Sequence, residues 1–350
     1  MGLKPLPLIA IQLWRLVGNW SDAVRTRLSQ DSYSEPVNSI INFIINFNVN
    51  VKLPRSLTII IFLLGIGGMI ALGLNLVVKY LQVQQIQQTQ QANNLLVQKK
   101  YTLAITAYDR LLEDNSAQPY ILWTNRGTAL LGLHQYQEAL QSCSQATELK
   151  PKADLAWNCR GEALYYLGQY DAAFAAWKQA IAINSQNATF WLNQNQVLFD
   201  LAQHGQAITA SQEAIALLQS QPPTSATNHH LAIALSRQGQ SWLELNKNQQ
   251  ALTAFNQSLT YQPNHLAAQQ GTGVALYRLG DYSEAIQTFE QILQRDNLTH
   301  QQQAINWLYQ GISFCETPQA SAATEAFKQV LQLTKNLQLR KIAQAGCGVR

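Results

Sequence analysis

The sequence predicts an all-α protein: a right-handed α-solenoid of about seven helix hairpins, preceded by one transmembrane helix. Two observations predict this architecture. A run of 23 residues without a charge lies in the N-terminal quarter, and a set of Trp, Gly and Ala positions then recurs every 34 residues. The first feature is long enough to cross a bilayer, and the second is typical of stacked helical repeats.

The composition indicates a folded chain and narrows its function. Of the 350 residues, 47% are hydrophobic, so the chain has enough apolar surface to bury a core. Only 13% are charged, against a usual share of about 25%, and the net charge is +4. A net charge of +4 is too small to indicate the concentrated basic face that a nucleic-acid-binding protein needs. We therefore expect no nucleic-acid partner.

Residues 1–53 are predicted to be an amphipathic, juxtamembrane segment. Apolar residues recur at helical spacing from Leu6 to Trp20, and asparagines recur every four residues from Asn38 to Asn50. A helix with a narrow amide stripe on an apolar cylinder is typical of a segment that lies in the membrane interface. A second membrane span is the weaker interpretation, because the second run is only about 15 residues long.

Residues 56–78 are the predicted transmembrane helix. As a helix, the run SLTIIIFLLGIGGMIALGLNLVV spans about 34 Å, which exceeds a hydrocarbon core of roughly 30 Å. Cations are concentrated before this run, and only Lys79 follows it closely. The positive-inside rule then places the N-terminus in the cytoplasm and the repeats on the periplasmic or lumenal side. Gly67 and Ala71 form a small-xxx-small pair, which makes a homo-oligomer a further expectation.

Residues 79–337 are the predicted repeat solenoid, followed by a capping helix and tail over residues 338–350. Trp123, Trp157 and Trp191 are 34 residues apart, and Gly and Ala positions keep the same step. One hairpin cannot bury its own apolar face, so successive hairpins stack. The predicted units are 85–118, 120–153, 154–187, 188–221, 232–265, 266–299 and 304–337.

The repeat resembles the tetratricopeptide repeat. Its best copies are WTNRGTALLGLHQYQEALQSCSQATELKP (123–151) and WNCRGEALYYLGQYDAAFAAWKQAIAINS (157–185). The resemblance covers about 250 residues and implies close packing at the Gly, Ala and Trp positions. It also implies a concave groove lined by the first helix of each unit. The glutamine-rich, charge-poor style resembles membrane-anchored repeat proteins of cyanobacteria, some of which assist the assembly of complexes.

The resemblance implies that the groove binds a protein or peptide partner. We therefore expect a membrane-anchored interaction scaffold that recruits partners or helps to assemble a membrane-associated complex. Tyrosine and arginine are frequent interface anchors, and both occur on the predicted groove face. The predicted groove residues are Thr124, Thr128, Leu131, Asn158, Glu162, Tyr165, Asn193, Gln196, Phe199, Arg237, Gln240, Tyr277, Arg278 and Tyr309.

One tetratricopeptide subfamily binds the acidic C-terminal tails of heat-shock chaperones through lysines, asparagines and an arginine. Asn193 and Arg237 match two of those positions. The required lysines are missing, because residues such as Asn158 and Glu162 occupy their places. We therefore do not expect this ligand.

No motif in the sequence indicates catalysis, a cofactor or a metal. There is no HExxH spacing, phosphate-binding loop or serine-nucleophile motif, so we predict a non-enzyme. Two alternatives stay open: a self-associating structural membrane scaffold and, with less support, a cofactor or metal delivery factor. His229 and His230 end the stretch QSQPPTSATNHH (219–230), which we interpret as a solvated loop rather than a metal site.

The four cysteines occupy predicted helices. Cys143 and Cys159 lie on neighbouring helices, and Cys315 and Cys347 lie in the last unit and the cap. We favour four small buried thiols, since the positions suit packing. Two local disulfides are the alternative if the repeats face an oxidising compartment.

Overall fold

The computed structural model describes residues 75, 78–79, 82–113 and 118–348. The predicted segment 1–53, the pair Gly67 and Ala71, and nearly all of the predicted span 56–78 lie outside these residues. Among the described residues, no helix has both the length and the apolar character that crossing a membrane requires. Residues 83–350 form one compact unit, and the description below concerns that unit.

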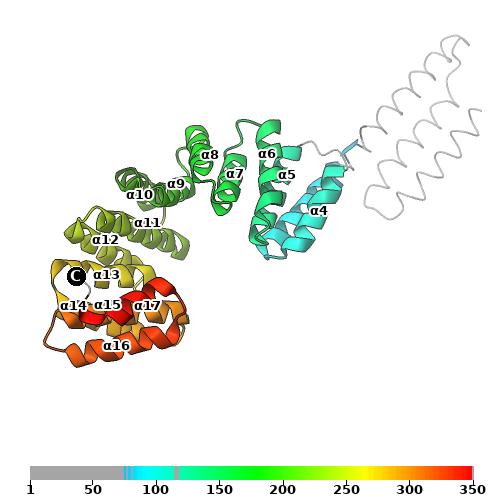
Figure 1. The fold of residues 1–350 in the computed structure, drawn as a ribbon. Helices are drawn as coiled ribbons and strands as arrows, with labels where there is room; N and C mark the ends of the chain where they lie inside the picture. Colours follow the sequence, from blue (N-terminus) through cyan, green and yellow to red (C-terminus); the bar gives the residue numbers. More distant parts are fainter. Residues whose placement is uncertain (1–74, 76–77, 80–81, 114–117, 349–350) are drawn as a thin grey trace, which may run out of the picture. The chain divides into compact units, whose positions relative to one another are not determined.

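The described chain is all-α and forms about seven consecutive helix hairpins, which confirms the predicted class of stacked hairpins (Figure 1). The first hairpin pairs a helix over residues 82–97 with α4. A single helix, α17, follows the seventh hairpin and ends in a short 3-10 turn, η1. The bounds are α4 Tyr101–Glu113, α5 Pro119–Gly132, α6 Tyr136–Leu149, α7 Asp154–Tyr166, α8 Tyr170–Ile183, α9 Ala188–Asp200, α10 His204–Gln219, α11 Ser225–Glu244, α12 Asn248–Tyr261, α13 Leu266–Leu279, α14 Tyr282–Leu293, α15 His300–Cys315, α16 Ala320–Leu333, α17 Leu337–Ala345 and η1 Gly346–Gly348.

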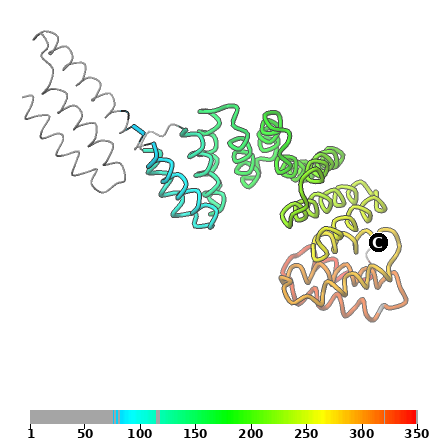
Figure 2. The backbone as a smooth tube through the Cα atoms, turned by 180° about the vertical axis from the view of Figure 1, so that it is seen from behind, coloured from blue at the N-terminus to red at the C-terminus, as the bar shows by residue number. Residues whose placement is uncertain are grey.

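Each helix packs on the next, so the hairpins lie side by side along the stack (Figure 2). The first helices of successive hairpins, from α5 through α15, also contact one another directly. The second helices lie mainly against first helices instead. The first helices therefore form the inner layer of the stack, which is where the predicted groove residues are located.

The recurring Gly, Ala and Trp positions are packing positions. Gly161 faces Trp177, and a Cβ added to this glycine would stand 2.7 Å from the indole nitrogen. Trp177 itself is only 2% exposed, so its ring has no room to withdraw. The indole N–H groups of Trp157 and Trp191 donate to carbonyl oxygens just before their own helices. These contacts fix each first helix against the preceding turn.

The turns within the hairpins share one backbone feature. Six of them place a residue with positive φ at the same point after the first helix, the left-handed region that glycine adopts without steric cost. Two of these residues are glycines and four are not. The angles are 58° at Lys99, 61° at His134, 75° at Gly168, 56° at Ala202, 55° at Asn246 and 90° at Gly280.

The interpretation of residues 219–230 as a solvated loop holds only for residues 220–224 and is wrong for the two histidines. Helix α10 continues to Gln219, and α11 begins at Ser225, so His229 and His230 lie within α11. The hydroxyl of Thr224 accepts a hydrogen bond from the backbone N–H of Thr227 and caps the helix. The inserted residues thus lengthen a first helix, because a capping residue directly follows the two prolines.

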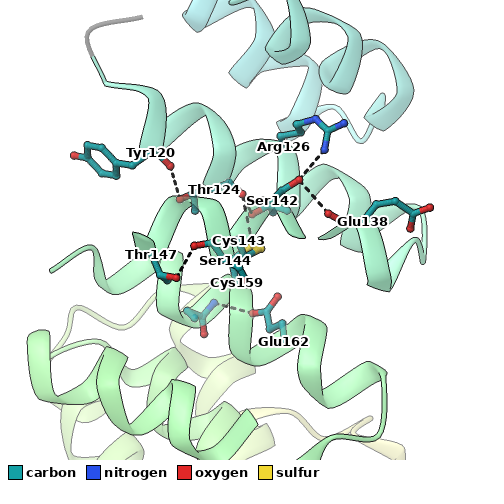
Figure 3. The surroundings of a disulfide bond; sticks show 12 residues. Tyr120, Thr124, Arg126, Glu138, Ser142, Cys143, Ser144, Thr147, Cys159 and Glu162 are labelled. Carbon is teal, nitrogen blue, oxygen red and sulfur yellow. Dashed lines mark hydrogen bonds between the residues drawn. A yellow bond between two sulfur atoms is a disulfide. The ribbon is translucent and has the colours of Figure 1, made fainter. Parts of the chain in front are cut away.

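The preference for four free thiols is also wrong, since the structure contains both disulfides. Cys143 of α6 is joined to Cys159 of α7 with Cα atoms 5.7 Å apart (Figure 3). Cys315 of α15 is joined to Cys347 of η1 at 5.3 Å. Both separations are ordinary for disulfides. The close packing of α6 on α7 buries Cys143 and Cys159 and also brings their sulfur atoms into bonding range, whereas Cys347 is exposed.

Candidate docking surface

The predicted groove residues lie on the first helices of six hairpins, from α5 to α15. With two exceptions they are partly or fully exposed. Thr124 is buried and donates to the carbonyl oxygen of Tyr120, and Leu131 packs into the core. The others are Thr128 on α5, Asn158, Glu162 and Tyr165 on α7, Asn193, Gln196 and Phe199 on α9, Arg237 and Gln240 on α11, Tyr277 and Arg278 on α13, and Tyr309 on α15.

A network of amides surrounds Glu162 and joins α7 to α9. Asn158 donates to the Glu162 carboxylate at 2.8 Å, and Asn193 donates to it at 3.2 Å. Asn158 in turn accepts from Asn193 and from the indole N–H of Trp177. Burial raises the pKa of Glu162, and the two amide hydrogen bonds oppose that rise. No ion pair in the described chain involves the Glu162 carboxylate. Only hydrogen bonds from neutral amides therefore stabilise its charged form.

A second polar group lies at the end of the same helices. The hydroxyl of Tyr165 donates to Asp200 at 2.7 Å, and Gln196 donates to the same carboxylate oxygen at 3.2 Å. Burial and the hydrogen bond to Asp200 raise the pKa of Tyr165. The phenol therefore stays protonated and remains a donor at neutral pH. Asp200 itself is exposed and has room for a further partner.

The arginines on the inner layer are already engaged. Arg237 donates to the backbone oxygen of Leu192 at 2.7 Å, and burial lowers its pKa. Arg278 donates to the backbone oxygen of Leu243. These guanidinium groups tie neighbouring first helices together, so they are less available to a ligand than the carboxylates are.

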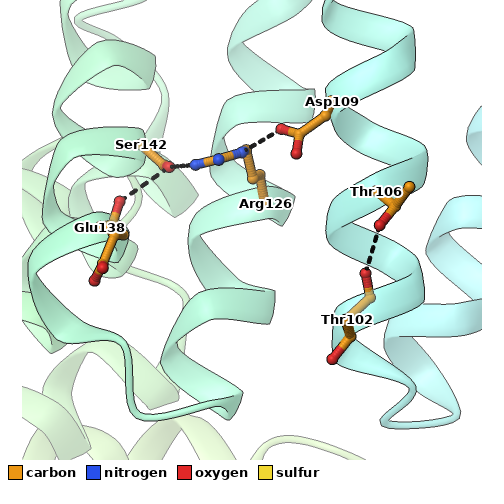
Figure 4. Close-up of polar contacts among 6 residues, drawn as sticks. All are labelled: Thr102, Thr106, Asp109, Arg126, Glu138 and Ser142. Atoms are coloured by element: carbon orange, nitrogen blue, oxygen red, sulfur yellow. Dashed lines mark hydrogen bonds and ion pairs between the residues drawn. The ribbon is translucent and has the colours of Figure 1, made fainter.

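Arg126 has a comparable internal role. Figure 4 shows it between Asp109 of α4 and Ser142 of α6. Its Nε atom lies 2.6 Å from Asp109, and its Nη1 atom donates to Ser142 at 2.7 Å. This side chain joins the first two hairpins and was not among the predicted groove residues.

The structure thus brings five of the predicted residues, Asn158, Glu162, Tyr165, Asn193 and Gln196, into two hydrogen-bonded groups on α7 and α9. It also adds two residues that the sequence reasoning missed, Asp200 and the exposed Tyr166. Asp200 follows Tyr165 by 35 residues, one repeat plus one position. This spacing can be read from the sequence, so it is the signal from which the contact between Tyr165 and Asp200 could have been predicted.

Comparison with protein families matches two models to this chain. One, described as "Tetratricopeptide repeat", covers residues 89–154 and 236–298. The other, described as "TPR repeat", covers residues 161–194. Comparison with curated proteins found no match.

Many solved structures share the fold at low sequence identity. A repeat protein from Parabacteroides merdae is 14% identical with a TM-score of 0.53, covering 74% of this chain and 97% of that one. PilF of Pseudomonas aeruginosa is 18% identical with a TM-score of 0.52, covering 65% and 96%. PilW, described as a type IV pilus biogenesis factor, is 20% identical with a TM-score of 0.55, covering 65% and 99%. At these identities the likeness concerns the fold alone.

Proposed function

We propose that this chain, a tetratricopeptide repeat protein, is a non-catalytic docking protein that holds partner proteins or peptides against the first helices of its solenoid. Tetratricopeptide repeats generally mediate protein–protein interactions. The observation that carries the proposal is the row of partly exposed polar and aromatic side chains on α7, α9 and α11. Such a mixture of amides, tyrosines and charges is typical of protein interfaces.

The proposal includes a membrane location. The predicted helix at 56–78 would hold the solenoid at a membrane, where it would recruit partners or help to assemble a complex. The two disulfides support a location on the periplasmic or lumenal side, because disulfides persist in oxidising compartments. This side agrees with the one that the positive-inside rule predicts for the repeats.

Site-specific photo-crosslinking in cells tests the docking surface. A crosslinking amino acid is placed at Gln196, on the inner face of α9, and in a matched chain at Gln206, an exposed residue on α10. We expect a defined crosslinked protein from Gln196 and none of that size from Gln206. Equal patterns from both positions, or no adduct from either, would overturn docking on this face.

Protease access tests the location separately. We expect added protease to degrade residues after 79 only once the outer barrier of the compartment has been opened, and never from the cytoplasmic side. Digestion of the repeats from the cytoplasmic side would overturn the proposed orientation without affecting the docking proposal.

A further inference from the structure

A three-residue arrangement lies at the turn of the third hairpin, and its two aromatic positions are also tyrosines in the sixth. In the third hairpin, Tyr165 lies in the last turn of α7 and Tyr170 begins α8, with ring centroids 5.5 Å apart. Asp200, which ends the next first helix, accepts the hydrogen bond from Tyr165. We name this arrangement of two aromatic side chains and a following carboxylate an edge triad.

The sixth hairpin carries the same pair of aromatic side chains. Tyr277 and Tyr282 occupy the equivalent positions, with ring centroids 5.7 Å apart. Burial raises the pKa of Tyr277, and the charge of Glu316 at the start of the next turn raises it further. Glu316 stands five residues after Gly311, as Asp200 stands five residues after Asn195, so it occupies the same position of the repeat as Asp200.

Neither carboxylate is neutralised by the protein. Both Asp200 and Glu316 are exposed, and no ion pair within the described chain involves either of them. Arg237 attracts Asp200 from a distance, but its guanidinium is bound to a backbone carbonyl oxygen. Each edge triad thus offers an open negative charge next to an aromatic surface.

The fifth hairpin provides an internal contrast. Leu243 and Asn248 take the two aromatic positions, and Arg278 takes the position of the carboxylate. Arg278 donates to the backbone oxygen of Leu243, and Asn248 donates to that of Arg278. The repeat geometry alone therefore does not require an aromatic pair beside a carboxylate.

We infer that the edge triads at Asp200 and Glu316 bind lysine or arginine side chains of the docked partner, so that the partner presents a basic, extended segment. A cation is attracted both to a carboxylate and to the negative face of an aromatic ring. The two carboxylates attract a basic segment by charge complementarity, and they would repel an acidic tail. This inference rests on the proposed docking function and adds the chemical class of the partner.

The test uses the full chain in a zwitterionic detergent, which does not itself attract basic peptides. The probe is a fluorescein-labelled 15-residue peptide of Gly-Ser-Arg repeats, and binding is followed by fluorescence anisotropy. We expect Asp200→Asn combined with Glu316→Gln to weaken binding about 10-fold, roughly 3-fold for each exposed charge pair. Binding by the parent chain should also fall as salt concentration rises.

The matched control removes the same net charge elsewhere. Glu213→Gln combined with Glu290→Gln changes exposed carboxylates on α10 and α14, which are second helices. We expect this variant to bind the arginine peptide as the parent does. The parent should not bind the same peptide with citrulline or glutamate in place of arginine. Unchanged binding by the Asp200 and Glu316 variant, or an equal loss in the control, would overturn the inference.

The two proposals fail separately. If Gln196 crosslinks a partner whose capture is unchanged by Asp200→Asn with Glu316→Gln, docking stands and the basic segment is overturned. If the arginine peptide binds through both carboxylates but no cellular partner is crosslinked, the triads stand as cation sites and the docking function is overturned.

Discussion

The third and fourth hairpins have the same backbone but fill their interior in opposite ways. In the third, Gly161 on the first helix leaves space that Trp177 on the second helix fills. In the fourth, the equivalent positions hold Asn195 and Ser211, both fully buried. Asn195 donates to the backbone oxygen of Ala207 at 2.6 Å, and Ser211 donates to the same oxygen. The combined volume, rather than the residue at either position, is what the fold requires.

The replacement of the Gly161 and Trp177 pair by Asn195 and Ser211 should make the fourth hairpin less stable. The side-chain oxygen of Asn195 is buried without a hydrogen-bond partner, which is unfavourable. The turn of this hairpin also places Ala202 at a positive φ, where the third hairpin has Gly168. In addition, the disulfide of Cys143 and Cys159 fastens the third hairpin to the second. We therefore expect the third hairpin to be the more stable of the two.

The largest expected effect comes from placing the fourth hairpin's residue in the third. Gly161→Asn should lower the free energy of unfolding by about 4 kcal/mol, because it overfills the space beside Trp177 and buries an amide. Urea unfolding followed by circular dichroism measures this loss. The matched control is Gly205→Ala, since a Cβ there meets no atom within 4 Å. A similar loss in both variants would contradict the packing explanation.

Removal of the disulfide should have the next largest effect. The variant Cys143→Ala with Cys159→Ala should lose about 2–4 kcal/mol in the free energy of unfolding, because its unfolded chain is less restricted. The same urea experiment measures it. Alkylation of the unfolded, unreduced parent followed by mass spectrometry gives an independent check. Label on either cysteine of the parent would show that this bond is not formed.

Exchanging the turn residues should give smaller, opposite changes. Ala202→Gly should raise the free energy of unfolding by about 0.5–1 kcal/mol, because the left-handed backbone no longer opposes a Cβ. Gly168→Ala should lower it by a similar amount. Thermal unfolding of the two variants beside the parent measures both shifts. Changes of the same sign in the two variants would contradict the role of the turn.

The smallest expected effect concerns pH and the inner face. Because burial raises the pKa of Glu162 in the folded chain, the folded state binds its proton more readily than the unfolded state. The carboxylate therefore reduces stability above its folded pKa, and the reduction disappears as pH falls below 4.5, the ordinary pKa of a glutamate. We expect Glu162→Gln to be slightly more stable than the parent at pH 7 and equal to it near pH 4. Urea unfolding at the two pH values measures the difference, and a less stable variant at pH 7 would contradict it.

The sequence alone predicted the stacked hairpins because their packing positions recur at a fixed step. Gly161 and Trp157 could be recognised from one repeat and checked against the next. The composition of residues 219–230, with two prolines and several polar residues, was a poor guide instead. Local composition does not show that Thr224 caps a helix, because a cap depends on the backbone direction that follows it.

Only the tertiary structure decided which residues of neighbouring repeats contact one another. The pairing of Cys143 with Cys159, the link from Tyr165 to Asp200 and the amide network at Glu162 each join residues of different hairpins. A periodic pattern reports which positions are buried within a repeat, since burial selects small or apolar residues. It does not report which polar side chains of adjacent first helices face one another, because that depends on how closely the hairpins stack.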